Sequence, residues 1–443
     1  MSETALTYQD LINEAFIDPI RTVTVIDDEY PTFKELLEGF NDEGFSLGGN
    51  IERLKKISEM CHNTHKWSLD VFNGKSPRIG GNDYISEHLN HSDLVILDYH
   101  LDGEPTSDNG ERARNIIKNL DSNNHFNIIL VHTKGVDEDI KEVYEEILFD
   151  LHNVKIPAFL IVDDDNLSLI EDWLDNNNDG EGYSWLEHSL GFEKTKLLKL
   201  LECKVDKIAL GFKNPNHIFY PYKEQISAIA NDSGVSTDDL IKWRLLEICN
   251  QQQISFSDAS RGDLIWDLPE GEANFIATGR VFVSVIRKVS DDPETELYQA
   301  LCNSLKKYNA SPMHLLMAKI RHEIDERGFE QAQSIIANRQ AQAGWLFTLL
   351  SSSSDNFVHD KAIDLHWEQL GRASKSSLRA FSHKISNVLS GQQEPKQVVK
   401  GFFRECIGNS DESCGQLNCS GQQKLATVLE FSQYNRSDSL GVK

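Results

Sequence analysis

Residues 93–113, DLVILDYHLDGEPTSDNGERA, hold the clearest passage from a strand to a helix in the chain. Leu94 to Leu97 form an uninterrupted apolar run, which is typical of a strand buried on both faces of a parallel sheet. The run ends in Asp98, and residues 110–120 continue with the spacing of an amphipathic helix. A strand that leads through an acidic turn into a helix is the repeating unit of α/β folds.

Units of the same kind lie on both sides of this stretch. RTVTVI, residues 21–26, is followed by an acidic pair, and NIILVH, residues 127–132, is followed by Thr133. Amphipathic segments separate these runs, as in βαβ units. We therefore predict an α/β fold with a doubly wound parallel five-stranded sheet that has helices on both faces. The strands are expected at 21–26, 67–72, 93–97, 127–132 and 156–162.

The chain of 443 residues carries 44 Lys and Arg against 70 Asp and Glu, a net charge of −26. This excess of acid argues against sequence-blind nucleic-acid binding, which works by neutralising phosphates, and against docking on an anionic membrane. No run of about 18 apolar residues is present, so we expect no membrane span. The start, MSETALTYQD, lacks a secretory signal, and seven mostly scattered cysteines suit a reducing cytoplasm.

Changes of composition divide the chain into five expected segments. Alternating strands and helices fill the first part, a connector rich in Asp, Asn and Gly follows, and the remainder is mainly α-helical. We predict an N-terminal arm at 1–19, the α/β domain at 20–165, a linker at 166–184, a helical domain at 185–290 and an α-helical C-terminal domain at 291–443.

Three acidic residues, Asp27, Asp28 and Asp98, fall at the ends of two expected strands. The carboxyl ends of parallel strands form the ligand crevice of an open α/β sheet. Carboxylates gathered there repel one another unless a cation is present, and Mg²⁺ prefers oxygen ligands. A carboxylate beside Mg²⁺ can act as a nucleophile toward phosphorus. The alternative is that these aspartates only cap the helices that follow.

The stretches VIDDEYPTFKELL and DLVILDYHLDGEPTSDNGERA resemble the first and third strand regions of response-regulator receiver domains. The resemblance covers roughly residues 20–165 and implies a flavodoxin-like fold. It implies that Asp98 is the phosphoacceptor, that Asp28 ligates Mg²⁺ directly and that Asp27 does so through water. The backbone carbonyl of His100 would be a further ligand, and Thr133 would hydrogen-bond the phosphoryl group and reposition after modification.

One departure from this family concerns the lysine that ends its fifth strand and pairs with the phosphoryl group. The expected fifth strand, IPAFLIV, runs into three aspartates at 163–165, and no lysine stands there. Lys134 follows a different strand. An acid in place of the lysine would repel the phosphoryl group. We therefore predict slow, incomplete phosphorylation, and a degenerate receiver that keeps the fold without switching stays an alternative.

Residues 223–244, KEQISAIANDSGVSTDDLIKWR, match the spacing of a helix-turn-helix, with Gly234 in the turn and Ser236 as the cap of the second helix. The runs GDLIWDLP and GRVFVSVIRK after it resemble the wing of a winged helix. The second helix opens with acid, which disfavours DNA, and protein contact is the alternative. The basic side chains that could meet nucleic acid are Lys242, Arg244, Arg280, Arg287 and Lys288.

Three further signals are weak. Cys406, Cys414 and Cys419 lack the spacing of a zinc site, and HEIDE, residues 322–326, lacks the second histidine of a zinc protease. The aspartates at 163–165 could serve a metal-dependent phosphoesterase together with Asp27 and Asp28, although a loop after a strand explains them equally.

The resemblance implies two-component signalling, in which a partner histidine kinase phosphorylates Asp98 and the change is relayed to the helical region. The receiver would assist its own Mg²⁺-dependent phosphorylation without being a turnover enzyme. The overall pattern is also similar to receiver-plus-helical proteins of bacterial antiviral gene clusters, whose partner is a GHKL-type ATPase. Alternatives are a non-switching docking subunit, a winged-helix transcription regulator and a metal-dependent hydrolase. Homo-oligomer formation stays open.

Overall fold

The computed structural model describes thirteen stretches of the chain, and it divides into two compact units. The described residues are 6–39, 50–74, 89–102, 108–134, 140–152, 162–177, 195, 197–198, 219–251, 264–267, 273–289, 292–350 and 356–392. The first unit comprises 1–153 and 259–388, and the second comprises 154–258 and 389–443. Among the described helices, none is both long and apolar enough to cross a bilayer.

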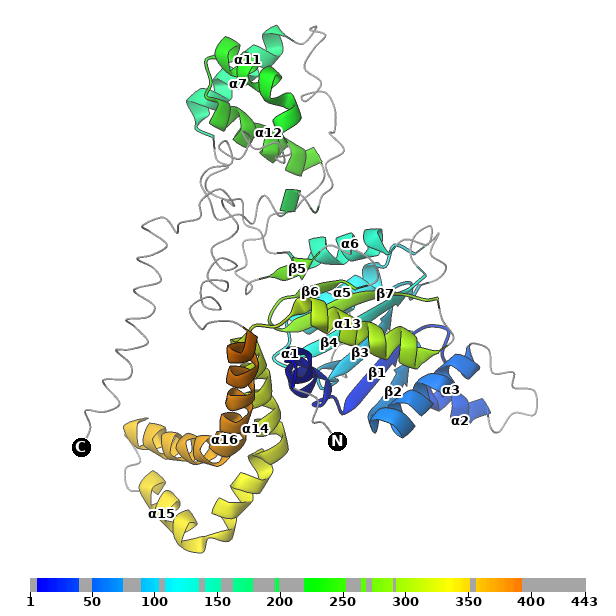
Figure 1. Cartoon of the computed structure of the whole chain (residues 1–443), viewed down its shortest axis with the longest axis vertical. Helices are drawn as coiled ribbons and strands as arrows, with labels where there is room; N and C mark the ends of the chain where they lie inside the picture. Colours follow the sequence, from blue (N-terminus) through cyan, green and yellow to red (C-terminus); the bar gives the residue numbers. More distant parts are fainter. Residues whose placement is uncertain are drawn as a thin grey trace. The chain divides into compact units, whose positions relative to one another are not determined.

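A seven-stranded sheet forms the centre of the first unit, with the order β2-β1-β3-β4-β7-β6-β5 (Figure 1). The first five strands in this order are parallel, and β6 and β5 continue the sheet in antiparallel fashion. All five residues of β3 and all seven of β4 are buried, as their apolar runs predicted. The strands are β1 (Thr22–Ile26), β2 (Ser68–Phe72), β3 (Leu94–Asp98), β4 (Asn127–Thr133), β5 (Ile265–Asp267), β6 (Phe275–Ala277) and β7 (Val281–Arg287).

The prediction of five strands is wrong in number and in the identity of the strand beside β4. That place is taken by β7, which pairs with β4 in parallel from Asn127↔Val281 to Thr133↔Arg287. The hairpin that was expected to be a wing therefore belongs to the α/β sheet. Its side chains from 281 to 286 are all buried, and burial of a continuous apolar run is what the centre of a parallel sheet offers. Residues 153–161, most of the expected fifth strand, lie outside the described residues.

Helices cover both faces of the sheet. Helices α5 (Glu111–Asp121) and α6 (Lys141–Leu151) contact each other on one face. The other face receives α3 (Ile51–Glu59) and α13 (Gln299–Tyr308), and α13 lies across the sheet in Figure 1. Shorter elements complete the unit, namely α1 (Tyr8–Ile12), α2 (Phe33–Gly39) and the π-helical turns at Asn13–Ile17, Met60–His65 and Glu294–Tyr298.

Gly110, the residue before α5, has a structural reason to be glycine. Its φ is +68°, in the left-handed region, and a Cβ there would lie 2.1 Å from the ring of Tyr99. Asp108 Oδ1 accepts a hydrogen bond of 2.9 Å from the Gly110 N–H. The turn therefore brings α5 close to the residue that follows Asp98.

A helical stem packs against this sheet at the edge where the strands begin. It consists of α14 (Pro312–Ala337), α15 (Arg339–Leu350) and α16 (Asn356–Gln392), with α14 and the end of α16 side by side in Figure 1. Ser377 Oγ donates to Glu323 Oε2 at 2.8 Å between these two helices. Lys384 Nζ lies 2.6 Å from Glu14 Oε2 of the N-terminal segment. The expected arm and part of the expected C-terminal domain thus belong to one unit with the sheet.

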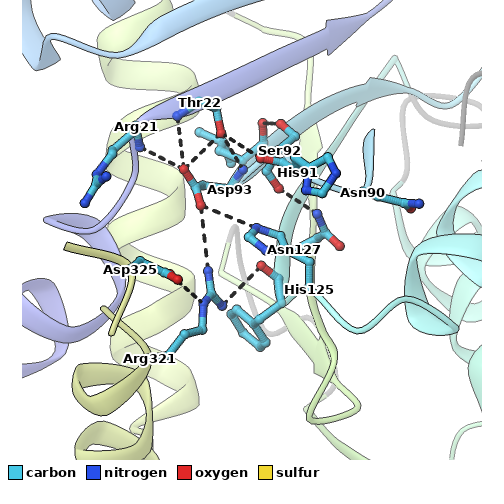
Figure 2. A network of polar contacts seen from close by, with 12 residues as sticks. Arg21, Thr22, Asn90, His91, Ser92, Asp93, His125, Asn127, Arg321 and Asp325 are labelled. Atoms are coloured by element: carbon cyan, nitrogen blue, oxygen red, sulfur yellow. Dashed lines mark hydrogen bonds and ion pairs between the residues drawn. The ribbon is translucent and has the colours of Figure 1, made fainter. Parts of the chain in front are cut away.

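Asp93 joins the start of the sheet to this stem (Figure 2). Its Oδ2 accepts from the Arg21 and Thr22 N–H groups at 3.0 and 3.1 Å, and its Oδ1 lies 3.7 Å from Arg321 Nη2 of α14. Burial would raise the pKa of Asp93, but His125 and these N–H groups outweigh it and lower the pKa to about 2. The folded protein therefore favours the ionised form of Asp93, and this charge stabilises the fold.

Replacing Asp93 with asparagine is expected to lower the free energy of unfolding at pH 7 by about 2 kcal/mol, because each pKa unit between folded and unfolded chain is worth about 1.4 kcal/mol. The folded pKa lies below the ordinary value of 3.8, so the stabilisation is present above that pH. It is lost as the pH falls from about 4 towards 2. Urea unfolding at a series of pH values checks this, with Asp325→Asn, at a more exposed carboxylate, as the control. A difference that does not change with pH would contradict it.

The second unit contains a small cluster of helices. These are α7 (Asp164–Asn176), α11 (Lys223–Ser233) and α12 (Thr237–Gln251), with a 3₁₀ turn at Tyr220–Tyr222. Helix α7 replaces most of the described part of the expected linker, because Ile170 and Trp173 are buried. The two helices and the turn expected at 223–244 are present: Gly234 has a φ of +73°, and Ser236 Oγ accepts from the Asp239 N–H at 3.1 Å.

Candidate functional site

The carboxyl ends of β1 and β3 bring three acidic side chains together, as the sequence predicted. Carboxylate oxygens of Asp27, Asp28 and Asp98 all lie within 4.8 Å of one another. Asp27 and Asp98 are buried, with 3% and 7% exposed, and Asp28 is half-buried. The turn after β1 is fixed by Asp27, whose Oδ1 accepts from the Glu29 N–H at 2.9 Å. Two neighbouring parallel strands therefore build this acidic cluster.

Lys288 completes the cluster, so the prediction that no strand-five lysine is present is wrong. Its Nζ lies 3.0 Å from Asp98 Oδ2 and 3.2 Å from Asp27 Oδ2. It directly follows β7, the strand beside β4, and its N–H donates to the Thr133 carbonyl at 2.8 Å. The lysine thus follows the strand that occupies the fifth position of the parallel sheet, although that strand comes from far along the chain.

The charges of this cluster are coupled. Burial raises the pKa of Asp98, Lys288 opposes this, and Asp27 and Asp28 raise the pKa as well, so that it lies at about 7. Burial alone would lower the pKa of Lys288, but the carboxylates of Asp98 and Asp27 outweigh it and raise it. One ammonium group thus faces three carboxyl groups, and the full cluster would carry an excess charge of about −2. A divalent cation with oxygen ligands fits that donor set.

The two remaining residues that were expected at the site lie at neighbouring strand ends. Thr133 ends β4 and is fully buried, with 0% exposed. His100, two residues after Asp98, is buried, and its Nδ1 lies 3.0 Å from the Asp108 carbonyl oxygen. Their roles, Thr133 as the phosphoryl contact and the His100 carbonyl as a metal ligand, stay predictions.

A buried ionic network that the sequence did not reveal lies next to Thr133. His132, which pairs with Asp98 in the β3–β4 register, contacts the carboxylate of Glu296, and so does Arg53 of α3. The other oxygen of Glu296 accepts from the Val289 N–H at 3.1 Å. Burial lowers the pKa of His132 to about 4, so the ring is neutral and Arg53 is the counter-ion of Glu296. Glu296 therefore holds the backbone directly after Lys288.

Replacing Glu296 with glutamine is expected to lower the free energy of unfolding by about 3–5 kcal/mol, because it removes the buried carboxylate charge that pairs with Arg53. Glu294→Gln, in the same helical turn, is the matched control. The Glu294 side chain is 37% exposed and pairs with His65 at 3.0 Å, so its loss should cost about 0–1 kcal/mol. Denaturant unfolding of wild type, Glu296→Gln and Glu294→Gln measures the two losses. Equal losses would contradict the buried ionic role of Glu296.

Most of the basic residues that were candidates for nucleic-acid contact are buried or paired with acidic side chains. Lys242 Nζ is held by Asp238 at 2.7 Å and Asp239 at 3.3 Å, and Arg244 is 2% exposed. Lys288 belongs to the acidic cluster, and Arg287 precedes it at the end of β7. The first two residues lie in the second unit and the last two in the first. The winged helix as a DNA reader is therefore not confirmed.

The weaker signals of the sequence lead to no described site. Asp163 caps α7, with its Oδ1 accepting from the Asn166 N–H at 2.8 Å, so a local structural role accounts for it. His322 lies within α14, and Glu323 beside it pairs with Lys319 and Arg327. The cysteines at 406, 414 and 419 lie outside the described residues. Among the Asp, Glu, His and Cys residues of the described part of the chain, one group has the spacing of metal ligands, and it consists of Asp27, Asp28 and Asp98.

Comparison with known families supports the receiver interpretation. Residues 19–179 match the family model described as a response receiver domain. The matched region contains β1 to β4 with the three aspartates and Thr133, and it ends before β7 and Lys288. A receiver domain indicates two-component-type signal transduction. The chain matches no curated protein and no solved structure.

Proposed function

We propose that this chain is a two-component-type signalling protein whose receiver domain accepts a phosphoryl group on Asp98. The donor is a partner histidine kinase or GHKL-type ATPase. The observation that carries the proposal is Lys288, whose Nζ lies 3.0 Å from Asp98 Oδ2 inside a cluster of three carboxyl groups. A buried lysine beside an acceptor carboxylate has an evident use in such a domain, because it can pair with the oxygens of the transferred group.

Mg²⁺ is the cofactor that the donor set fits. Asp27, Asp28 and Asp98 would hold it, with the His100 carbonyl as a further ligand. When bound, Mg²⁺ neutralises charge that develops on the phosphoryl oxygens. Because Lys288 balances one of the three carboxylates, a divalent ion would bring the cluster close to neutrality. This is the expected arrangement for a site that must then receive a dianionic group.

Asp98, Lys288 and Thr133 would each have a separate role in the phosphoryl transfer. A carboxylate oxygen of Asp98 attacks the phosphorus, the bond from phosphorus to the donor's imidazole nitrogen breaks, and that nitrogen keeps the electron pair. The ammonium group of Lys288 then pairs with the phosphoryl oxygens, and the hydroxyl of Thr133 donates to one of them. Asp98 must be ionised to attack, and in the metal-free protein burial and the neighbouring aspartates raise its pKa to about 7.

A route to the helical stem starts at Lys288. When the ammonium group moves from the carboxylates to a phosphoryl group, the backbone at Val289 would move with it. The Val289 N–H donates to Glu296 at 3.1 Å, so the movement would reach Glu296. Glu296 lies within the turn Glu294–Tyr298, which continues into α13, and α13 leads into α14. The buried charge network around Glu296 would therefore adopt one arrangement in the unphosphorylated protein and another in the phosphorylated protein.

Mg²⁺ is expected to stabilise the protein against thermal unfolding, since a ligand bound only by the native state adds about 2.7 kcal/mol at 100 times its Kd. Asp28→Asn should abolish this response, because it removes the carboxylate that is expected to ligate the ion directly. Asp70→Asn, on β2 at a distance from the cluster in sequence, serves as the control. Thermal melting with Mg²⁺ and with EDTA measures the effect. An equal response of wild type and Asp28→Asn would contradict the metal site.

The cytoplasmic, bacterial antiviral setting is part of this proposal and rests on the order of a receiver and a helical region. The gene beside this one tests it. A histidine kinase or GHKL ATPase there supports signalling. A lone gene preceded by its own palindrome favours a transcription regulator, for which helices α11 and α12 are the supporting observation; the expected wing belongs to the sheet instead.

A further inference from the structure

The far end of the helical stem exposes six large apolar side chains, which we call the apolar tip. They are Trp345, Leu346, Phe347 and Leu350 of α15 and Ile363 and Trp367 of α16, with exposed fractions between 50% and 74%. The part of the stem beside the sheet buries Leu315, Phe381, Ile385 and Val388, although Met313 and Met317 are exposed there. A concentration of this many apolar side chains at one end of a stem indicates an interaction surface.

The arrangement on α15 restricts what can cover the tip. Consecutive helical residues point about 100° apart, so Trp345, Leu346 and Phe347 face three different directions. All three are at least half exposed. A flat partner surface could cover only one of these directions. A helix that is apolar on all sides belongs inside a bundle, with neighbouring helices around it.

The charge of the stem indicates which partner supplies those helices. Residues 312–392 carry nine Lys and Arg against eight Asp and Glu, whereas the whole chain carries 44 against 70. Two copies of this acidic chain repel each other over most of their surface, and the near-neutral stem is where they can meet. The tip also carries both signs, with Arg339 exposed on α15 and Asp360 and Asp364 exposed on α16.

We propose that two copies of this chain associate through the apolar tip, with α15 and the first turns of α16 of each copy forming a four-helix arrangement. A twofold axis places the same patch of both copies in contact, so Arg339 of one copy meets Asp360 and Asp364 of the other. The association goes beyond the proposed signalling function and does not depend on phosphorylation of Asp98. It also assigns a function, dimerisation, to the helical stem, which takes no part in the phosphoryl transfer itself.

Sedimentation of the full chain between about 1 and 50 µM, the range of ordinary specific association, tests the proposal. Wild type should sediment at twice the mass of a single 50.2 kDa chain. A Phe347→Glu and Leu350→Glu double variant should dimerise at least about 100-fold more weakly, since buried charge without a partner is costly. Met313→Glu is the control, because Met313 is 62% exposed on α14 but lies outside the tip. Circular dichroism confirms that each variant is folded.

A charge exchange tests the twofold contact itself. Arg339→Glu should weaken the dimer, and mixing it with an Asp360→Arg and Asp364→Arg chain should restore association between the two variants. The proposal is overturned if wild type stays monomeric throughout this range, which would assign the tip to a different protein. It is equally overturned if the dimer survives the double variant, or if the mixed variants fail to associate.

Discussion

Replacing Lys288 with alanine is expected to reduce phosphoryl uptake at Asp98 by about 10- to 100-fold. The substitution removes one charge-assisted contact, worth about 1.5–3 kcal/mol, and each 1.4 kcal/mol corresponds to a factor of ten. It also leaves Asp27 and Asp98 buried without their shared cation. In the absence of metal, the free energy of unfolding should therefore fall by about 3–5 kcal/mol.

The same substitution should strengthen Mg²⁺ binding, because three carboxylates then face the ion with no competing ammonium group. Tighter metal binding combined with slower phosphorylation is a pattern that general damage to the fold would not give. Lys134→Ala is the control. Lys134 follows Thr133, its side chain is 54% exposed, and its Nζ lies 3.7 Å from Glu29. Calorimetric Mg²⁺ titration and phosphorylation rates of both variants separate the two lysines, and equal behaviour would refute the role of Lys288.

Replacing Asp98 with asparagine is expected to stabilise the metal-free protein at pH 8 by roughly 2–4 kcal/mol. The folded pKa of Asp98, about 7, lies above its ordinary value of 3.8. For an acid this means that the folded state favours the protonated form, so stability falls as the pH rises from about 4 through 7. Asparagine resembles the neutral acid and avoids that loss.

Urea unfolding in EDTA at pH 5 and pH 8 measures this effect. The difference between variant and wild type should be small at pH 5 and large at pH 8. Adding Mg²⁺ should stabilise wild type and leave Asp98→Asn almost unchanged, which reverses the order of the two proteins. If the variant is less stable than wild type at pH 8 without metal, burial and the neighbouring aspartates do not disfavour the ionised form of Asp98.

The sequence was sufficient to predict β1, β3 and β4 and the acidic cluster, because these depend on local patterns. Each strand is an apolar run of five to seven residues, and Asp27, Asp28 and Asp98 follow or end such runs. Parallel strands that are neighbours in the sheet then bring their carboxyl ends together without further information.

Lys288 could not be placed in this way, because residues 134–280 separate β7, the strand that it follows, from β4, the strand that β7 pairs with. VFVSVIR has the apolar pattern of a strand, but a pattern does not state which strand is the partner. IPAFLIV at 156–162 looked equally suitable and lies directly after the helix that follows β4. The signal that was available is the lysine itself, since GRVFVSVIRK is a late strand-like run with a lysine at its end.

Glu296 escaped prediction for another reason. In the sequence it is one acidic residue in the polar stretch DDPETE, which resembles a solvated helix start. Its burial, with 5% exposed, arises only when β4, α3 and the segment after β7 meet. Tertiary packing of three distant segments decides its role, and no local periodicity carries that information.

Phosphoryl uptake by the intact protein tests the central claim most directly. The full chain is incubated with Mg²⁺ and a small acyl-phosphate donor, and its mass is measured before and after hydroxylamine treatment, which cleaves an aspartyl phosphate. Wild type should gain one phosphoryl group and lose it to hydroxylamine, Lys288→Ala should gain only a small fraction, and Asp98→Asn should gain none. A wild-type protein that takes up no phosphate, or an Asp98→Asn protein that takes up as much as wild type, would contradict the assignment of Asp98 as phosphoacceptor.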